Sequence, residues 1–173
     1  MLSVKELRGL AGTLGSDLFV QQLGPFVLVQ RPPPEEAERA GVNLSARMST
    51  QMSDPEEISQ GMVSLLFEFE RLLVATLPPL QGVDALSVGR LPDNDLVLDD
   101  PSVSKRHAVI RWRADKHRCT VTDQDSTNGT FINGVGRVRR ETTLRDGDIV
   151  SFGEVQFWYW ETPTLWTKLS RVK

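Results

Sequence analysis

The chain has 173 residues, of which 39% are hydrophobic and 25% charged, a composition typical of globular proteins and not of disordered ones. This length allows one ordinary domain with additional elements, or two very small domains. The net charge of −3 argues against a nucleic-acid partner, because polyanion binding requires a strongly basic protein. One cysteine and two histidines exclude an internal disulfide and the usual four-ligand zinc sites, and nothing in the sequence indicates a metal or another cofactor.

The N-terminus carries charged residues where a signal peptide would have an apolar segment. No uncharged apolar stretch approaches the roughly 18 residues that a membrane-spanning helix needs. Together with the single cysteine, these features predict a cytoplasmic protein without a membrane partner.

Residues 1–31 are predicted to form an N-terminal extension of helix, helix and strand. Ser3 and Glu6 have the spacing of a capping box, and apolar residues at helical spacing follow them. A second short helix should end at Gly24, and the apolar run 26–29 is typical of a strand.

Residues 32–57 begin with consecutive prolines and continue as a polar stretch, which indicates a linker. The following segment, 58–77, fits helical and strand periodicity about equally well. We expect a short helix to Gly61 and strand-like structure from 63 to 77, as the beginning of a sandwich domain that extends over 58–161.

From residue 78 onward, short apolar runs recur roughly every 8–12 residues and are separated by turn residues, which predicts an all-β sandwich or barrel. The strongest hairpin signal is Asn133-Gly134, because both residues tolerate a positive φ. The last residues, 162–173, are treated as a C-terminal tail, and the tryptophans on either side of its start are expected to cover the N-terminal extension.

Three polar loops, at 88–94, 101–107 and 125–130, lie between these apolar runs. Together they offer arginine, lysine, serine, threonine and asparagine side chains. Guanidinium, hydroxyl and amide donors are the groups that bind a phosphate dianion. Loops held by a rigid sheet scaffold are also where binding sites are usually found. The three loops are therefore predicted to form an anion-binding site.

Residues of these loops and of the segments that follow them, in their order and spacing, resemble the signature of the forkhead-associated (FHA) domain over about 80–161. The residues that carry the resemblance are Gly89, Arg90, Asn94, Asp95, Ser104, Lys105, Arg106, His107, Ala108, Asp123, Ser126, Thr127, Asn128, Gly129, Thr130, Asn133, Gly134, Leu144, Gly147, Asp148, Ile149, Phe152 and Gly153. The resemblance implies a mainly β fold, an antiparallel sandwich of about eleven strands, whose loops bind phosphothreonine peptides. The style of the sequence is typical of a bacterial protein.

The resemblance also assigns roles to individual residues. Arg90, Ser104, Lys105 and Thr127 would hold the phosphate, and Asn128 would bind the peptide backbone just past the phosphothreonine. Four further residues would support the site: Gly89, His107, Asn133 and Gly134. Arg106 is left out of the site. Ser102 and Ser126 are candidates for reading the peptide sequence, although neither carries a charge.

These assignments imply an adaptor in Ser/Thr-kinase-dependent signalling or assembly, and not an enzyme. Its partner would be a phosphothreonine-containing protein, either a kinase or a kinase substrate. Ser104 and His107 are three residues apart, but no third orienting group or hydrolase motif accompanies them. The alternative is an FHA-fold scaffold or oligomerisation protein that binds partners without phosphate. In that case residues 1–63 would form the docking or homo-oligomer surface. A further hypothesis is that Thr50, Thr162 or Thr164 is phosphorylated and bound by a second copy of the protein.

Overall fold

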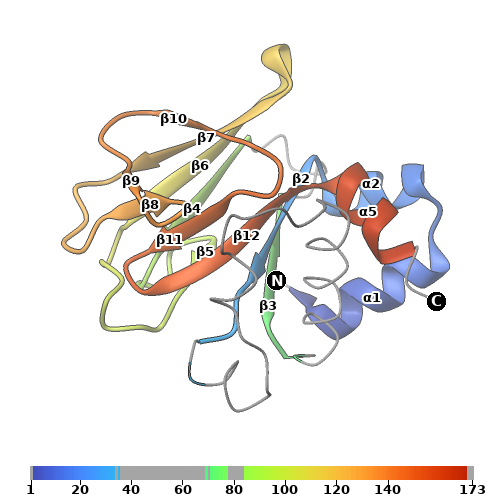
Figure 1. Ribbon diagram of the computed structural model, residues 1–173, viewed down its shortest axis with the longest axis horizontal. Helices are drawn as coiled ribbons and strands as arrows, with labels where there is room; N and C mark the ends of the chain where they lie inside the picture. The colour runs from blue at the N-terminus through green and yellow to red at the C-terminus, as the bar shows by residue number, and fades with distance from the viewer. Residues whose placement is uncertain (1, 34, 36–68, 70, 78–83, 171–173) are drawn as a thin grey trace, which may run out of the picture.

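The computed structural model describes residues 2–33, 35, 69, 71–77 and 84–170. Within these residues, two β-sheets face each other, and three helices cover the outer side of the larger sheet (Figure 1). The fold class expected from the sequence, a mainly β sandwich with short N-terminal helices, is confirmed. The elements are β1 (Leu2–Ser3), α1 (Val4–Thr13), α2 (Ser16–Leu23), β2 (Phe26–Gln30), β3 (Leu73–Thr76), β4 (Ala85–Gly89), β5 (Leu96–Val97), β6 (Ala108–Arg113), a 3₁₀ turn (Ala114–Lys116), β7 (Arg118–Asp123), β8 (Thr130–Ile132), β9 (Gly136–Arg137), β10 (Thr142–Leu144), β11 (Ile149–Phe152), β12 (Val155–Glu161) and α5 (Thr162–Ser170).

The larger sheet has the strand order β1-β3-β2-β12-β11-β8-β9, and the smaller has the order β10-β7-β6-β4-β5. Neighbouring strands are antiparallel except β4 and β5, which are parallel. One hydrophobic core fills the space between the sheets, and a second lies between the larger sheet and the helices. The described residues are therefore arranged as three layers with two cores.

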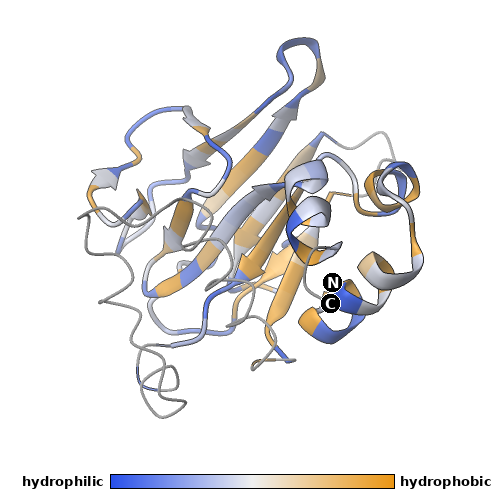
Figure 2. Ribbon diagram, turned by 45° about the vertical axis from the view of Figure 1, so that its right-hand side comes forward, coloured by the Kyte–Doolittle hydropathy of each residue, from blue (hydrophilic) through white to orange (hydrophobic). Residues whose placement is uncertain are grey.

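Strand β2 explains why the sequence has an uninterrupted apolar run at this position. Phe26 and Leu28 belong to the core between the sheets, whereas Val27 and Val29 face the helices. All four side chains are fully buried. Successive residues of a strand point to opposite faces, so a strand that is covered on both faces must be apolar at every position. Figure 2 shows this apolar colouring continuing across the strands beneath the helices.

Strand β12 follows the same rule with aromatic residues. Phe157 and Tyr159 lie in the core between the sheets, and Trp158 and Trp160 lie under the helices. The indole nitrogen of Trp166, on α5, donates to the carbonyl of Leu14 at 3.0 Å. The expectation that these tryptophans cover the N-terminal extension is thus confirmed. The tail itself differs from the sequence-based description, because residues 162–170 form the helix α5.

The N-terminal extension and the sandwich share one sheet. β2 pairs with β12 along its whole length, and β3 pairs with the other edge of β2. The boundary expected at residue 31 therefore follows the end of a strand that lies inside the sandwich sheet. Most of the expected linker, 32–57, and the ambiguous segment 58–68 lie outside the described residues, so the division into domains stays a prediction.

Within the described part of the segment 63–77, regular strand is limited to β3. The chain makes a turn just before β3, where the N–H of Leu72 donates to the carbonyl of Phe69 at 3.2 Å. This turn allows Val4 to donate to the Leu72 carbonyl at 3.1 Å, which joins the start of α1 to the sheet. The strand is consequently shorter than the alternating pattern of the sequence predicts.

Local signals at the N-terminus are confirmed. Both hydrogen bonds of the capping box between Ser3 and Glu6 are present at the start of α1. α2 ends at Gly24, whose φ of 85° suits a glycine. One hypothesis is corrected here: Thr162 is fully buried and its hydroxyl donates to the Gly24 carbonyl at 2.6 Å, so it is not an exposed phosphorylation site.

Candidate functional site

The three polar loops predicted to form a site come together at one end of the sandwich. They follow β4, precede β6 and follow β7, while the β6–β7 hairpin closes the opposite end of the same strands. Backbone hydrogen bonds link the first two loops directly, since the N–H of Arg90 donates to the Ser104 carbonyl at 3.0 Å. The N–H of Leu91 donates in the same way to the Lys105 carbonyl at 3.2 Å.

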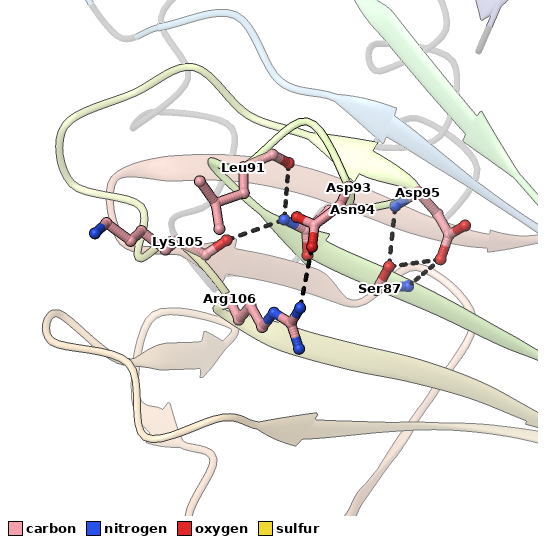
Figure 3. A network of polar contacts seen from close by, with 7 residues as sticks. All are labelled: Ser87, Leu91, Asp93, Asn94, Asp95, Lys105 and Arg106. Atoms are coloured by element: carbon pink, nitrogen blue, oxygen red, sulfur yellow. Dashed lines mark hydrogen bonds and ion pairs between the residues drawn. The ribbon is translucent and has the colours of Figure 1, made fainter.

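Gly89 permits this close approach. A Cβ atom at position 89 would lie 2.3 Å from the Lys105 carbonyl oxygen and 2.8 Å from the side-chain nitrogen of Asn94. Asn94 uses that nitrogen to donate to the carbonyls of Leu91 and Lys105, each at 2.9 Å (Figure 3). Only a residue without a side chain leaves room for this three-way contact, so Gly89 holds the Arg90 loop against the Ser104 loop.

Two carboxylates anchor the outer side of the first loop (Figure 3). Asp95 accepts hydrogen bonds from both the N–H and the hydroxyl of Ser87, at 2.8 and 2.6 Å. Asp93 forms an ion pair with Arg106 at 3.0 Å between two exposed side chains. Arg106, which was left out of the expected site, is therefore directed toward a carboxylate of the neighbouring loop.

Ser104 lies between the second and third loops. Its hydroxyl oxygen accepts a hydrogen bond from the N–H of Thr127 at 3.0 Å, and its own N–H donates to Nδ1 of His107 at 3.0 Å. Because Nδ1 accepts, the proton of a neutral imidazole is on Nε2, which donates to the Gly129 carbonyl at 3.0 Å. The hydroxyl proton of Ser104 remains available for an acceptor in front of the loops.

A network around a partly buried carboxylate supports the third loop. Asp123 accepts from the hydroxyls of Ser126 and Thr130, each at 2.6 Å, and from the N–H of Ser126 at 3.0 Å. Burial alone would raise the pKa of Asp123, but these hydrogen bonds together hold its pKa below the usual value. The Ser126 hydroxyl also accepts from the Gly129 N–H at 3.0 Å. The loop therefore has an internal frame.

Asn128 is exposed, and its amide reaches across to the second loop, where it donates to the Ser102 carbonyl at 2.8 Å. Its side-chain oxygen and its second N–H hydrogen make no other hydrogen bond to the residues that the structure describes. The Ser102 hydroxyl donates to the Asp100 carboxylate at 2.6 Å, and the same hydroxyl oxygen accepts from the Glu154 N–H at 2.9 Å. The Asn128 amide thus spans the two loops and keeps groups for a further partner.

Arg90 and Lys105 complete the set. Both side chains are exposed, and neither makes a hydrogen bond or ion pair with another of the described residues. In Figure 3 the ammonium group of Lys105 points away from the other labelled residues. The backbone hydrogen bonds between the first two loops hold the Arg90 backbone against Ser104, which Lys105 follows in the sequence. The arrangement offers two unpaired positive charges, a hydroxyl donor and an amide at one rim.

The remaining predicted residues, Asn133 and Gly134, lie at the other end of β8. Their φ values of 53° and 74° form the turn between β8 and β9. The Asn133 side chain also accepts from the Ile149 N–H and donates to Asp148, both at 2.9 Å. The structure brings Gly89, Arg90, Ser104, Lys105, His107, Thr127 and Asn128 together, while Asn133 and Gly134 make no hydrogen bond to the three loops among the described residues.

The same contacts leave no catalytic dyad at Ser104. The two ring nitrogens of His107 are occupied by the Ser104 N–H and the Gly129 carbonyl, so neither can take a proton from the Ser104 hydroxyl. Burial raises the pKa of the Cys119 thiol to about 12, which keeps this thiol protonated. Across residues 2–33, 71–77 and 84–170, no group of three or more histidine, cysteine, aspartate or glutamate residues could hold a metal ion.

The contribution of His107 to the stability of the folded loops should depend on pH. Burial lowers the pKa of His107 below the usual value, although the Gly129 carbonyl and Asp123 act in the opposite direction. We expect its contribution to the free energy of unfolding to be complete above about pH 6.5 and to be lost as the pH falls below it, because the unfolded protein then binds a proton that the folded protein resists. Carboxyl groups whose pKa is lowered in the folded protein change the free energy of unfolding only below about pH 4.

The measurement is urea unfolding of wild type and His107→Gln between about pH 7.5 and pH 5. The wild type should lose stability over this range, and the variant should show a flatter dependence. The sequence has only two histidines, so NMR titration of His117→Ala reports His107 alone. A titration of His107 at or above about pH 6.5 would contradict the assignment.

Comparison with known proteins matches residues 86–153 to the FHA domain. Among curated relatives, the transcriptional regulatory protein EmbR of Mycobacterium tuberculosis is 38% identical over 150 residues, which is 84% of this chain and 37% of EmbR. The glycogen accumulation regulator GarA of the same organism is 40% identical over 72 residues, 39% of this chain and 40% of GarA. The chain thus spans less than half the length of these two relatives.

Among solved structures, full-length yeast Pml1p superposes with a TM-score of 0.51 over 92% of this chain and 93% of its own, at 20% identity. This likeness concerns the fold alone. The similarity to EmbR covers 84% of the sequence, and so extends well beyond residues 86–153.

Residues 86–153 of the chain are an FHA domain, and the chain has homologues in actinobacteria. Relatives of the chain are named as regulators: GarA is a glycogen accumulation regulator, and a relative in Corynebacterium jeikeium is an oxoglutarate dehydrogenase inhibitor. No helix of the described residues is long and apolar enough to cross a membrane.

Sequence reasoning passed over two kinds of residue near the site. The anchors Asp93 and Asp100 were not singled out, although an aspartate close to a serine or an arginine in a polar loop is a recognisable pairing signal. Arg137 was also passed over, and the sequence carried no signal for it. It reaches the third loop only because β9 pairs with β8.

Proposed function

We propose that this protein is a phosphothreonine-peptide-binding adaptor that acts in Ser/Thr-kinase-dependent signalling or assembly. Arg90 and Lys105 would neutralise the phosphate, Ser104 and Thr127 would donate their hydroxyl protons to it, and Asn128 would bind the peptide backbone. A phosphothreonine carries about −1.5 to −2 charges and three acceptor oxygens, which matches two cations and two hydroxyl donors.

The observation that carries the proposal is the hydrogen bond from the Thr127 N–H to the Ser104 hydroxyl oxygen, at 3.0 Å. A hydroxyl has one proton to donate. With its oxygen engaged by Thr127 and no carboxylate bonded to it among the described residues, the Ser104 hydroxyl keeps that proton for a ligand. Arg90 and Lys105, which pair with no described residue, supply the charge that an anionic ligand requires.

The partner we propose is a phosphothreonine-containing protein, either a Ser/Thr kinase or a substrate of one. The cytoplasmic location stays a prediction. So does a homo-oligomer through residues 1–63, because most of the segment from 34 to 63 lies outside the described residues. The alternative function, a scaffold that binds without phosphate, keeps one observation in its favour: β2 is part of the sandwich sheet, and the helices pack against that sheet.

The testing experiment is binding to an oriented phosphothreonine peptide library, with matched phosphoserine and unphosphorylated pools. We expect selective phosphothreonine binding by wild type and a loss of at least about tenfold in Ser104→Ala, which removes one charge-assisted hydrogen bond. Ser170→Ala, on the exposed end of α5, is the matched control and should bind as wild type. A folded wild type that binds none of the pools would favour the scaffold function.

A further inference from the structure

The two serines considered for reading the peptide sequence are both engaged inside the protein. Ser126 is 5% exposed, and its hydroxyl donates to Asp123 while accepting from the Gly129 N–H. The Ser102 hydroxyl donates to Asp100 and accepts from the Glu154 N–H. Neither hydroxyl is free to select a peptide side chain, so a selecting group must lie elsewhere on the rim.

The third loop leads away from the expected phosphate position. Thr127 is bonded to Ser104, Asn128 follows it, and Gly129 comes next, just before β8 begins. If the phosphate lies at Ser104 and the peptide backbone at Asn128, the peptide residues that follow the phosphothreonine extend toward Gly129. The side chains beside Gly129 then decide which of these residues are favoured.

Arg137 occupies that position. A Cβ atom at Gly129 would lie 3.0 Å from Nε and 3.3 Å from the guanidinium carbon of Arg137, and 3.0 Å from the ring of Phe131. Phe131 and Arg137 are directly opposite in the β8–β9 pair, which places both side chains on one face of the hairpin. The absence of a side chain at Gly129 lets the guanidinium rest against the loop backbone next to Asn128.

The Arg137 side chain is exposed and has no hydrogen bond or ion pair to any residue that the structure describes. Of the two other arginines at this end, Arg106 is neutralised by Asp93 at 3.0 Å, and Arg90 is the residue that we assign to the phosphate. Arg137 therefore presents an unpaired planar fork of donors, the group best suited to a carboxylate.

We propose that Arg137 is a specificity-determining residue that favours phosphothreonine peptides in which an acidic residue follows the phosphothreonine. The inference rests on the proposed function, since it places the peptide by Ser104 and Asn128. It narrows the proposed partner from any phosphothreonine-containing protein to one whose phosphothreonine is followed by acidic residues.

The test uses phosphothreonine peptides that are identical except for aspartate or lysine at one of the first four positions after the phosphothreonine. Fluorescence anisotropy at low ionic strength would give the ratio of the two affinities at each position. For wild type we expect aspartate to be favoured by about threefold to fivefold at one position at least, the effect of one exposed ion pair. Arg137→Ala should bring the ratio close to one, and Arg137→Glu should reverse it.

Arg118→Ala is the matched control, because it removes the same charge from an exposed arginine at the far end of β7. That end is roughly 17 Å from Asp123 along the strand, and the aspartate-to-lysine ratio should not change. A wild type without the preference, or an Arg137→Glu variant that keeps it, would overturn the inference while phosphothreonine binding persists. Loss of all phosphothreonine binding in wild type would instead refute the proposed function and this inference with it.

Discussion

Replacing Arg90 with alanine should reduce affinity for a phosphothreonine peptide by about a hundredfold or more. Each hydrogen bond to a charged group contributes about 1.5–3 kcal/mol, and a guanidinium can make two to one phosphate. Arg90→Lys keeps the charge but not the fork, so we expect an intermediate loss of roughly tenfold. Isothermal titration calorimetry with one phosphothreonine peptide measures both variants.

The control for this prediction is Arg106→Ala. Arg106 lies on the adjacent loop and carries the same charge, but it is held by Asp93 at 3.0 Å in an exposed ion pair. Such pairs contribute about 0–1 kcal/mol, so the variant should bind within about fivefold of wild type. Thermal unfolding should be unchanged in Arg90→Ala, since its hydrogen bond to Ser104 comes from the backbone. Equal losses in both alanine variants would show a general charge effect and would contradict the role of Arg90.

Replacing Gly89 with alanine should lower both stability and peptide affinity. The added Cβ would lie 2.3 Å from the Lys105 carbonyl oxygen, a backbone atom that can move only if the two loops separate. Overpacking of this kind costs about 1–3 kcal/mol. The same separation would lengthen the hydrogen bonds from Arg90 and Leu91 to the second loop, which moves Arg90 away from Ser104. Urea unfolding and calorimetry with the same peptide measure the two effects.

Gly9→Ala is a control in which the same substitution should raise stability and not lower it. Gly9 is exposed inside α1, and a Cβ there would meet no atom within 4 Å. Alanine at such a position should stabilise the helix by about 0.5–1 kcal/mol and leave peptide binding unchanged. If Gly89→Ala unfolds and binds as wild type does, the close contact between the two loops does not position the site.

The FHA assignment could be made from sequence because the domain's three polar loops are local features. Gly89-Arg90, the run from Ser104 to His107, and the run from Ser126 to Thr130 are contiguous groups at characteristic spacings. Asn133-Gly134 likewise predicts its hairpin because only residues that tolerate positive φ suit the turn. The capping box of Ser3 and Glu6 is equally local.

Local sequence signals could have predicted two features that the sequence analysis missed, the C-terminal helix and the strands buried on both faces. The tail at 162–170 forms α5, and its Thr162-Pro163 start resembles the helix-start pattern with proline in the first turn. The apolar runs of β2 and β12 could have indicated strands covered on both faces. Such runs do not by themselves say what covers them, and here the cover comes from helices that precede β2 and follow β12.

Local sequence patterns were enough to establish the family, the sandwich class and the residues of the three loops, because turn chemistry, capping and alternation act between residues that are close in sequence. Three further features emerged only in the folded protein: β2 and β3 complete the sandwich sheet, both nitrogens of His107 are occupied, and Arg137 lies against Gly129. Each depends on contacts between segments far apart in sequence or on the pairing of one strand with another. Such contacts are set by the packing of the whole core, which no local pattern records.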